Sequence, residues 1–227
     1  MSKQTIAPVT FVCIPASKYL QTIAIVALLG FLAPMASAQT ITLKHTYYTT
    51  VYDTVKKAPI YTTYTLTKAH LKAVIKRKST FYADELVGNN LQAFNGVYKN
   101  NGVYDKGHLS PAADFCFNAK AYRQVMYYTN TAPQQEYFNE HLWEAVEEAT
   151  RDSCRQYGNI KVFTGCLYGN KKLDGIAIPT AYWKVIIYDG GKKAAWLGQN
   201  KKPSSNQPDT IKDKVSDIEA KTGLRFE

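Results

Sequence analysis

The chain has 227 residues, of which 45% are hydrophobic and 20% are charged. This apolar content is enough for a core and excludes a disordered chain, while only 13 glycines and no sustained heptad exclude collagen-like and coiled-coil repeats. The 28 lysines and arginines outnumber the 18 aspartates and glutamates, which gives a formal charge of +10 and a pI near 9.3. A basic surface suits a polyanionic partner, either nucleic acid or an acidic membrane, and charge alone does not choose between them.

Residues 1–38 have the pattern of an export signal. A basic start precedes an apolar run over 23–33, and Ala36-Ser37-Ala38 forms a small-x-small cleavage site. The run is short against the roughly 20 residues that a membrane-spanning helix needs, which disfavours the alternative of an uncleaved anchor. We therefore expect cleavage after Ala38, a secreted or periplasmic domain over 39–227, and no stable membrane association after cleavage.

Three cysteines remain in the expected mature chain, at Cys116, Cys154 and Cys166. An oxidising compartment favours one disulfide with one thiol left over, and the absence of a C-x-x-C motif disfavours structural zinc. If Cys154 ends a helix and the next strand runs back along it, Cys166 lies beyond the roughly 7 Å that a disulfide allows between Cα atoms. The better prediction is a Cys116–Cys166 bridge.

The first half of the domain predicts strands followed by irregular chain. Threonine and tyrosine dominate residues 41–66, which favours β-strands, and the polar segment 53–59 predicts a turn between them. Residues 67–78 predict a short helix that ends in the basic cluster Lys76-Arg77-Lys78. Glycine and asparagine are frequent over 84–105, which indicates mainly loop.

The second half contains the clearest helical pattern, which begins near Asn139 and ends before Gly158. Residues 160–164 and 182–188 then predict strands. Because strands interleave with few helices, we expect one α+β domain with a mainly antiparallel central sheet flanked by helices.

The C-terminal region predicts a loop and a last helix. Residues 190–209 are rich in Gly, Lys, Ser, Asn and Pro, which indicates a basic loop that either follows a nucleic-acid backbone or is a solvated hairpin tip. Ser216 with Glu219 three residues later predicts a capping box, and Gly223 predicts the end of the helix.

Residues able to do chemistry lie between these regions, and each has an ordinary explanation when taken singly. His108 and Lys106 are of types common on surfaces, Asn139 suits a helix N-cap, and Glu147 stands four residues before Arg151, as in a solvated helix ion pair. Their order and spacing carry more information. The segments are Asp105-Lys106-Gly107-His108, Asn130-Thr131-Ala132-Pro133-Gln134, Asn139 nine residues after Asn130, and Glu147 eight after Asn139.

This set resembles the motif of the DNA/RNA non-specific endonucleases of the ββα-metal class, the family of Serratia nuclease and mitochondrial endonuclease G. That motif is D-R-G-H, then N-x-x-P-Q, then a helix that opens on Asn with a Glu eight residues later. Further landmarks extend the resemblance to roughly residues 45–226. Lys106 replaces the usual Arg of the motif. A lysine ammonium offers a phosphate a single point charge, whereas an arginine guanidinium binds it with a planar pair of N–H donors.

The resemblance implies a Mg²⁺-dependent endonuclease, with Mn²⁺ as the alternative metal, that hydrolyses DNA and RNA with little sequence specificity and leaves 5′-phosphate ends. A neutral imidazole suits a general base, which is the implied role of His108. Mg²⁺ prefers oxygen ligands, and the implied protein ligand is the amide oxygen of Asn139. Glu147 starts about 12 Å further along the helix axis, so an outer-shell role on metal-bound water fits it better than direct ligation.

Three more residues complete the predicted site. The resemblance implies that Asn130 supports the geometry of His108 or the metal, and that Lys106 holds a phosphate of the substrate. Arg77 either holds a neighbouring phosphate or is a plain surface charge, since the family alignment is loose at this position. A non-catalytic nucleic-acid-binding module on the same fold is the main alternative function, although it predicts loss of His108 or Asn139, and both are present. A secreted phosphodiesterase for a small substrate is a further alternative. The preference between DNA and RNA and the oligomeric state stay open.

Overall fold

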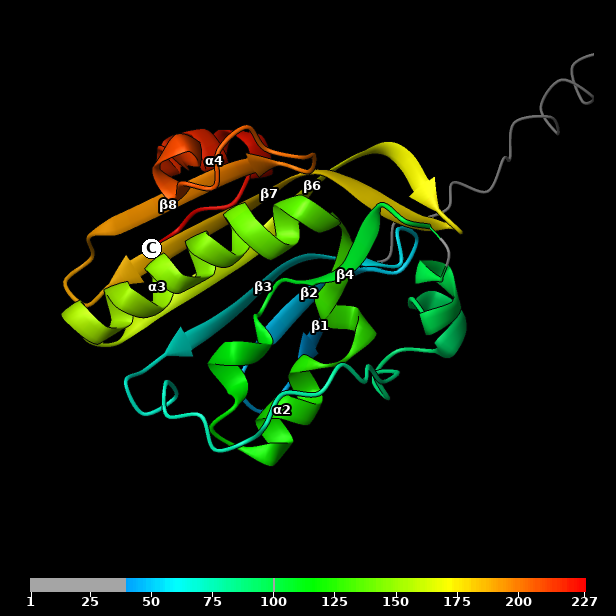
Figure 1. The fold of residues 1–227 in the computed structure, drawn as a ribbon, viewed down its shortest axis with the longest axis horizontal. Helices are drawn as coiled ribbons and strands as arrows, with labels where there is room; N and C mark the ends of the chain where they lie inside the picture. Colours follow the sequence, from blue (N-terminus) through cyan, green and yellow to red (C-terminus); the bar gives the residue numbers. More distant parts are fainter. Residues whose placement is uncertain (1–39, 100) are drawn as a thin grey trace, which may run out of the picture. The chain divides into compact units, whose positions relative to one another are not determined.

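Within the described residues of this computed structural model, 40–99 and 101–227, seven antiparallel strands form the central sheet (Figure 1). Their order across the sheet is β1-β2-β3-β6-β7-β8-β9, with bounds Thr40–Lys44, Thr49–Asp53, Ala58–Leu66, Ile160–Leu173, Ile176–Tyr188, Lys193–Gln199 and Lys212–Asp213. This agrees with the predicted α+β class and its antiparallel sheet. The predicted export signal lies outside the described residues.

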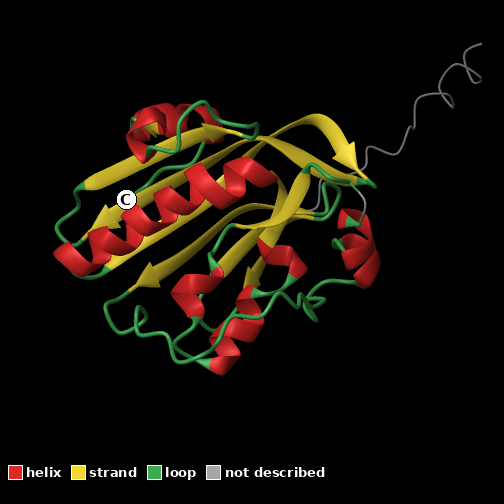
Figure 2. Cartoon of the chain, viewed as in Figure 1, coloured by secondary structure: helices red, strands yellow, loops and turns green. Residues whose placement is uncertain are grey.

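Successive side chains of β7 point to opposite faces of the sheet, and the two faces pack against different clusters. Tyr182 and Ile186 belong to the large core cluster on the face that α3 (Glu144–Tyr157) covers (Figure 2). The intervening Trp183 and Val185 belong to a second cluster on the opposite face. That second cluster also contains Ile218 of α4 (Val215–Thr222) and Phe226, which follows this helix near the C-terminus, and both are almost fully buried.

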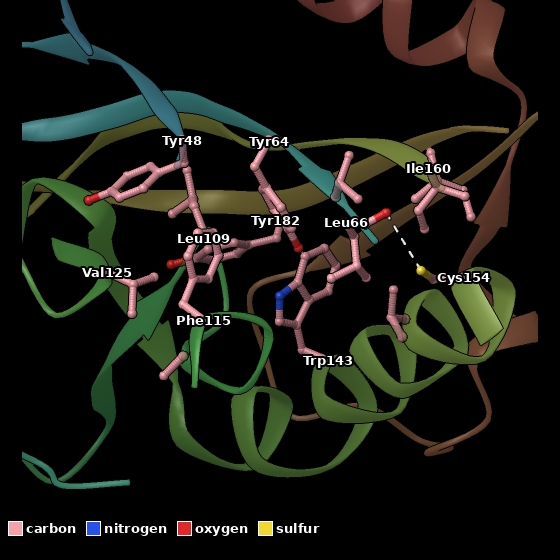
Figure 3. Close-up of a cluster of buried hydrophobic side chains, with 14 of the residues drawn as sticks. Tyr48, Tyr64, Leu66, Leu109, Phe115, Val125, Trp143, Cys154, Ile160 and Tyr182 are labelled. Atoms are coloured by element: carbon pink, nitrogen blue, oxygen red, sulfur yellow. Dashed lines mark hydrogen bonds between the residues drawn. The ribbon is translucent and has the colours of Figure 1, made fainter. Parts of the chain in front are cut away.

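The apolar stripe of α3 explains how the helix attaches to the sheet. Val146, Thr150 and Cys154 recur every four residues and are buried, as the 3.6-residue period predicts. Figure 3 shows the interior between helix and sheet, where the Trp143 ring lies 5.7 Å from the Tyr182 ring and the Cys154 thiol donates to the Leu66 carbonyl at 3.5 Å. This face therefore holds the main core.

A small second sheet carries the motif. β4 (Tyr104–His108) pairs antiparallel with β5 (Thr131–Gln135), and a π-helical turn, Phe138–Trp143, leads from β5 into α3. The order strand, strand, helix is the predicted ββα arrangement. Gly107 is needed within β4 because a Cβ there would collide with the side chain of Gln134 on β5. Within the described residues, α2 (Ala119–Val125) is a further α-helix, capped by the Asn118 side chain, which accepts from the Lys120 and Ala121 amides.

The predicted helix over 67–78 is wrong, since this segment forms turns, bends and irregular chain. The backbone N–H groups of Val74 and Ile75 donate to the Cys116 carbonyl at 2.8 and 2.9 Å. Long-range hydrogen bonds therefore replace the local ones that a helix would need.

The predicted loop over 190–209 is also partly wrong, because β8 occupies 193–199. Ala195 and Trp196 are buried against the sheet, and this burial together with pairing to β7 outweighs the weak strand propensity of the segment. Gly190 and Gly191, both with positive φ, form the β7–β8 turn, so the first part of the predicted loop is a hairpin tip.

The predicted capping box at Ser216 does not form. Lys214 is the N-cap residue of α4 without a side-chain cap hydrogen bond, and Ser216 lies inside the helix. Gly223 ends the helix as predicted, with a left-handed φ of 71°.

The predicted Cys116–Cys166 disulfide is wrong. Cys116, Cys154 and Cys166 are all free and buried. The Cys116 thiol donates to the Ala112 carbonyl at 3.3 Å within its own turn, whereas Cys166 lies on β6 in the sheet. The three thiols serve as small core residues. Among the described helices, none combines the length and apolar character that a bilayer crossing requires.

Candidate active site

Two adjoining cavities, of about 670 and 510 Å³, form one cleft beside the ββα unit. Both are lined by Arg77, His108, Ala112, Asn139 and Glu140, so they share a wall at the motif residues. Lys106 lines the larger cavity, and Glu147 lines the smaller one. The structure thus brings five of the six predicted site residues to one cleft, although they come from three separate segments of the chain.

His108 ends β4 with its ring toward the cleft. Its Nε2 atom is buried and has no hydrogen-bond partner, and its ring centroid lies 5.0 Å from that of Phe81. Burial lowers the pKa of His108 to about 3, helped by the positive charges of Arg77 and Lys106. The imidazole is therefore neutral at physiological pH and has a nitrogen free to accept a proton.

Asn130, the sixth predicted residue, is fully buried behind the cleft. Its Oδ1 accepts from the Ser110 N–H at 2.9 Å, and its Nδ2 donates to the carbonyls of Ser110 and Val125 at 2.9 and 2.8 Å. Its own carbonyl accepts from the Leu109 N–H at 2.9 Å. These bonds hold the chain that directly follows His108, so Asn130 supports the position of the histidine and does not contact the cleft.

Asn139 lies in the π-helical turn, and Asp105 fixes the orientation of its amide. The Asn139 Nδ2 donates to Asp105 Oδ2 at 2.9 Å, so the amide nitrogen is engaged and Oδ1 remains available as an acceptor. Asp105 stands first in the motif, but sequence reasoning assigned it no role. Its function as an orienting partner depends on the β4–helix contact, which spacing alone does not reveal.

The π-helical turn also aligns Asn139 with Glu147. Eight regular α-helical residues at roughly 100° each would leave the two side chains roughly 80° apart around the axis. A π-helical turn accommodates one extra residue, which removes roughly 100° of rotation and brings them within roughly 20°. Both residues consequently line the same cavity.

Glu147 lies among buried charges that the sequence did not locate. Lys184 of β7 is fully buried, donates to Thr164 Oγ1 at 2.9 Å, and interacts electrostatically with Glu147. Burial raises the pKa of Glu147 to about 7, although the charges of Lys184 and Arg151 favour its ionised form. Glu147 therefore titrates near neutral pH in the metal-free protein.

Arg151 has a different partner from the one expected. Its NH1 lies 3.2 Å from Asp114 Oδ1, and its NH2 lies 2.8 Å from Glu148 Oε2. Asp114 is buried and also accepts from the Tyr64 hydroxyl at 2.6 Å. The guanidinium thus links α3 through buried Asp114 to Tyr64 of β3, and it also pairs with the half-exposed Glu148 of its own helix.

The donor groups fit a hydrated magnesium ion. Among the described residues there is no group of three or more His, Cys, Asp or Glu side chains that could hold a metal. The cleft instead offers the free amide oxygen of Asn139 and the carboxylate of Glu147, which are hard oxygen donors. Mg²⁺ keeps most of its waters and needs few protein ligands, so this set suits it better than it suits zinc.

We expect the Glu147→Gln variant to gain stability relative to wild type as the pH rises in metal-free buffer. A carboxyl whose folded pKa is raised costs no stability below its unfolded pKa of 4.5 and costs progressively more as the pH rises through about 7. Glutamine stays neutral and avoids this cost. Urea unfolding at pH 5 and pH 8 measures the difference, and an equal difference at the two pH values would contradict the assigned shift.

Comparisons with known proteins agree with this geometry. Residues 31–227 match the family model described as DNA/RNA non-specific endonuclease. The chain is 31% identical over 186 residues to mitochondrial nuclease 1 of Schizosaccharomyces pombe, covering 71% of this chain and 58% of that protein. It is 31% identical over 128 residues to human mitochondrial endonuclease G, covering 50% and 43%.

Two further likenesses have wider coverage of this chain. The salivary endonuclease of Lutzomyia longipalpis is 29% identical over 213 residues, which cover 79% of this chain and 51% of that protein. A crystal structure of an EndoG/EndoGI complex matches with a TM-score of 0.71 and 25% identity, covering 83% of this chain and 86% of that one. The chain spans roughly half the length of the relatives named here. From the ββα cleft and the family match together, the chain belongs to the DNA/RNA non-specific endonuclease family.

Proposed function

We propose that this protein is an exported, Mg²⁺-dependent endonuclease that hydrolyses DNA and RNA with little sequence preference and leaves 5′-phosphate ends. The observation that carries the proposal is the meeting of an unpartnered His108 Nε2 and the available Asn139 Oδ1 in one cleft. The names of the nuclease relatives support the reaction class. Export rests on residues 1–38 alone.

The residues of the cleft divide the work of phosphodiester hydrolysis. His108 accepts the proton of the attacking water, and its low pKa keeps it in the basic form. Arg77 and Lys106 bind substrate phosphates, and Asn139, whose amide Asp105 fixes, would hold the ion through its amide oxygen. A bound Mg²⁺ would stabilise the negative charge that develops on the phosphate.

Glu147 and Asn130 act one step away from the reacting atoms. Glu147 faces the cavity that Asn139 also lines, so it can accept hydrogen bonds from the waters of a hydrated ion. Asn130 holds the backbone after His108. Arg77 and Lys106 are suited to contacts with backbone phosphates rather than with base edges. Such contacts are common to DNA and RNA and depend little on sequence, which is consistent with the proposed activity on both.

The pH dependence of the free enzyme follows from His108. Its unperturbed pKa of 6.5 is lowered to about 3, so the base remains deprotonated through mildly acidic pH. We therefore expect that a plot of log kcat/KM against pH shows no decline near pH 6.5 caused by protonation of His108. The profile should be measured under saturating metal. An acid limb centred at 6.5 that disappears in His108 variants would show that the cleft does not depress this pKa.

Incubation with circular plasmid DNA and with RNA, in Mg²⁺ and in EDTA, tests the proposal. We expect nicking and then fragmentation of both substrates in Mg²⁺ and no cleavage in EDTA. Mn²⁺ should be run in parallel, because oxygen donors accept it too. Binding without cleavage under every divalent metal would instead support the non-catalytic binding module.

A further inference from the structure

Lys106 occupies the motif position that usually carries arginine, and its surroundings differ from those of an ion pair. Its ammonium lies 5.1 Å from the centroid of the Phe81 ring and 5.3 Å from that of the Tyr98 ring. It takes part in none of the salt bridges found among residues 40–99 and 101–227. Two aromatic faces therefore hold the charge without neutralising it.

The Phe81 ring packs against two other rings. It lies 6.0 Å from the Tyr128 ring in a stacked arrangement, and 5.0 Å from the His108 ring. The residue that follows is tied to the same region, because the Tyr82 N–H donates to the Met126 carbonyl and the Tyr82 carbonyl accepts from the Tyr128 N–H, both at 3.0 Å. Phe81 thus contacts both the phosphate-binding lysine and the general base.

Tyr98, the second aromatic residue at the Lys106 ammonium, is held by its own set of contacts. The Asn101 Nδ2 donates to the carbonyls of Tyr98 and Tyr104 at 2.8 and 3.1 Å, which ties this loop to the start of β4. Val97, the preceding residue, is buried in a small cluster against which Tyr98 packs. Tyr98 contacts the Lys106 ammonium and has no ring contact with His108, although its hydroxyl also interacts with Thr131 of β5, so the Tyr98→Phe variant is needed to separate the ring from the hydroxyl.

A lysine needs such support more than an arginine does. Arginine binds a phosphate through a planar fork of donors, whereas lysine presents a point charge on a flexible stem. A carboxylate partner would aim the ammonium but would also cancel the charge that the substrate needs. We infer that Phe81 and Tyr98 are positioning residues that aim the Lys106 ammonium at a substrate phosphate, an inference that rests on the proposed nuclease function.

A double-mutant cycle between Tyr98 and Lys106 tests the inference. Tyr98→Leu should lower kcat/KM roughly 3- to 30-fold, the range expected from a lost cation–π contact. In a Lys106→Met background the same change should have an effect below about 2-fold, because no ammonium remains to be aimed. Tyr98→Phe keeps the ring and should recover most of the loss. Tyr157→Leu, at an exposed tyrosine of α3, is the matched control.

The same variants should be measured for binding of a short DNA duplex in EDTA, which gives a readout independent of cleavage. Coupling between Tyr98 and Lys106 in both kcat/KM and Kd is the expected result. Equal losses in the wild-type and Lys106→Met backgrounds, or no loss from Tyr98→Leu, would overturn the inference. If wild type binds DNA with this coupling but cleaves nothing, the proposed function fails and the positioning role stands. Thermal unfolding of each variant identifies any that fails to fold.

Discussion

The His108→Ala variant is expected to lose roughly 100- to 10,000-fold in kcat, the usual contribution of a positioned general base. The imidazole is the group in the cleft that combines a free, buried nitrogen with a neutral state at physiological pH. Affinity for nucleic acid should change little, because Arg77 and Lys106 still face the cleft. Single-turnover cleavage and equilibrium binding to the same labelled duplex separate the two effects.

A matched histidine provides the control for this experiment. His70 stacks on Phe117 at 4.0 Å and lines neither cavity of the cleft, so His70→Ala should retain cleavage close to wild type. If His108→Ala cleaved within about 10-fold of wild type while binding normally, another group would have to be the base.

The Asn139→Ala variant is expected to show the second large effect, on the response to metal. Loss of the amide oxygen removes the predicted protein ligand, so the Mg²⁺ concentration at half-maximal rate should rise by more than the roughly 10- to 100-fold typical of changes to orienting groups. Asp105→Ala leaves the Asn139 ligand present but frees its amide to rotate. The half-maximal Mg²⁺ concentration of this variant should therefore rise only within the roughly 10- to 100-fold range. Rates measured across a Mg²⁺ titration provide the comparison.

Asn159→Ala is the matched control, since this asparagine is exposed in the turn after α3. Its half-maximal Mg²⁺ concentration should equal that of wild type. An unchanged metal response in Asn139→Ala would remove this residue from the metal site and leave the carboxylates that line the cleft, Asp105, Glu140, Glu144 and Glu147, as the candidate ligands.

The parts of the fold that local pattern controls were predictable from the sequence. The Thr- and Tyr-rich strands and the helix that ends at Gly158 follow from residue type and period, and Gly223 ends α4 because its φ is left-handed. The segment 67–78 was not predictable as irregular chain, because its bonds to the Cys116 carbonyl join residues far apart in sequence. The strand β8 depends in the same way on pairing with β7.

The candidate site was likewise predictable where it depends on sequence spacing and not where it depends on tertiary contacts. Motif spacing was sufficient to select His108, Asn139 and Glu147, which the structure places around one cleft. The orienting role of Asp105 and the buried Lys184 required the tertiary structure, because each acts on a residue from another element. The π-helical turn is likewise invisible in the spacing, although it brings Asn139 and Glu147 onto one face.

The chemistry of the cut ends tests the central claim most directly. A short duplex should be cleaved by the purified protein with Mg²⁺ in water enriched in heavy oxygen, and the products analysed by mass spectrometry. Attack by water with departure of the 3′ oxygen predicts 5′-phosphate ends that carry the heavy isotope, and their absence with His108→Ala. Products with 3′-phosphate ends, or 5′-phosphates without the label, would contradict a cleft in which His108 activates water for this displacement.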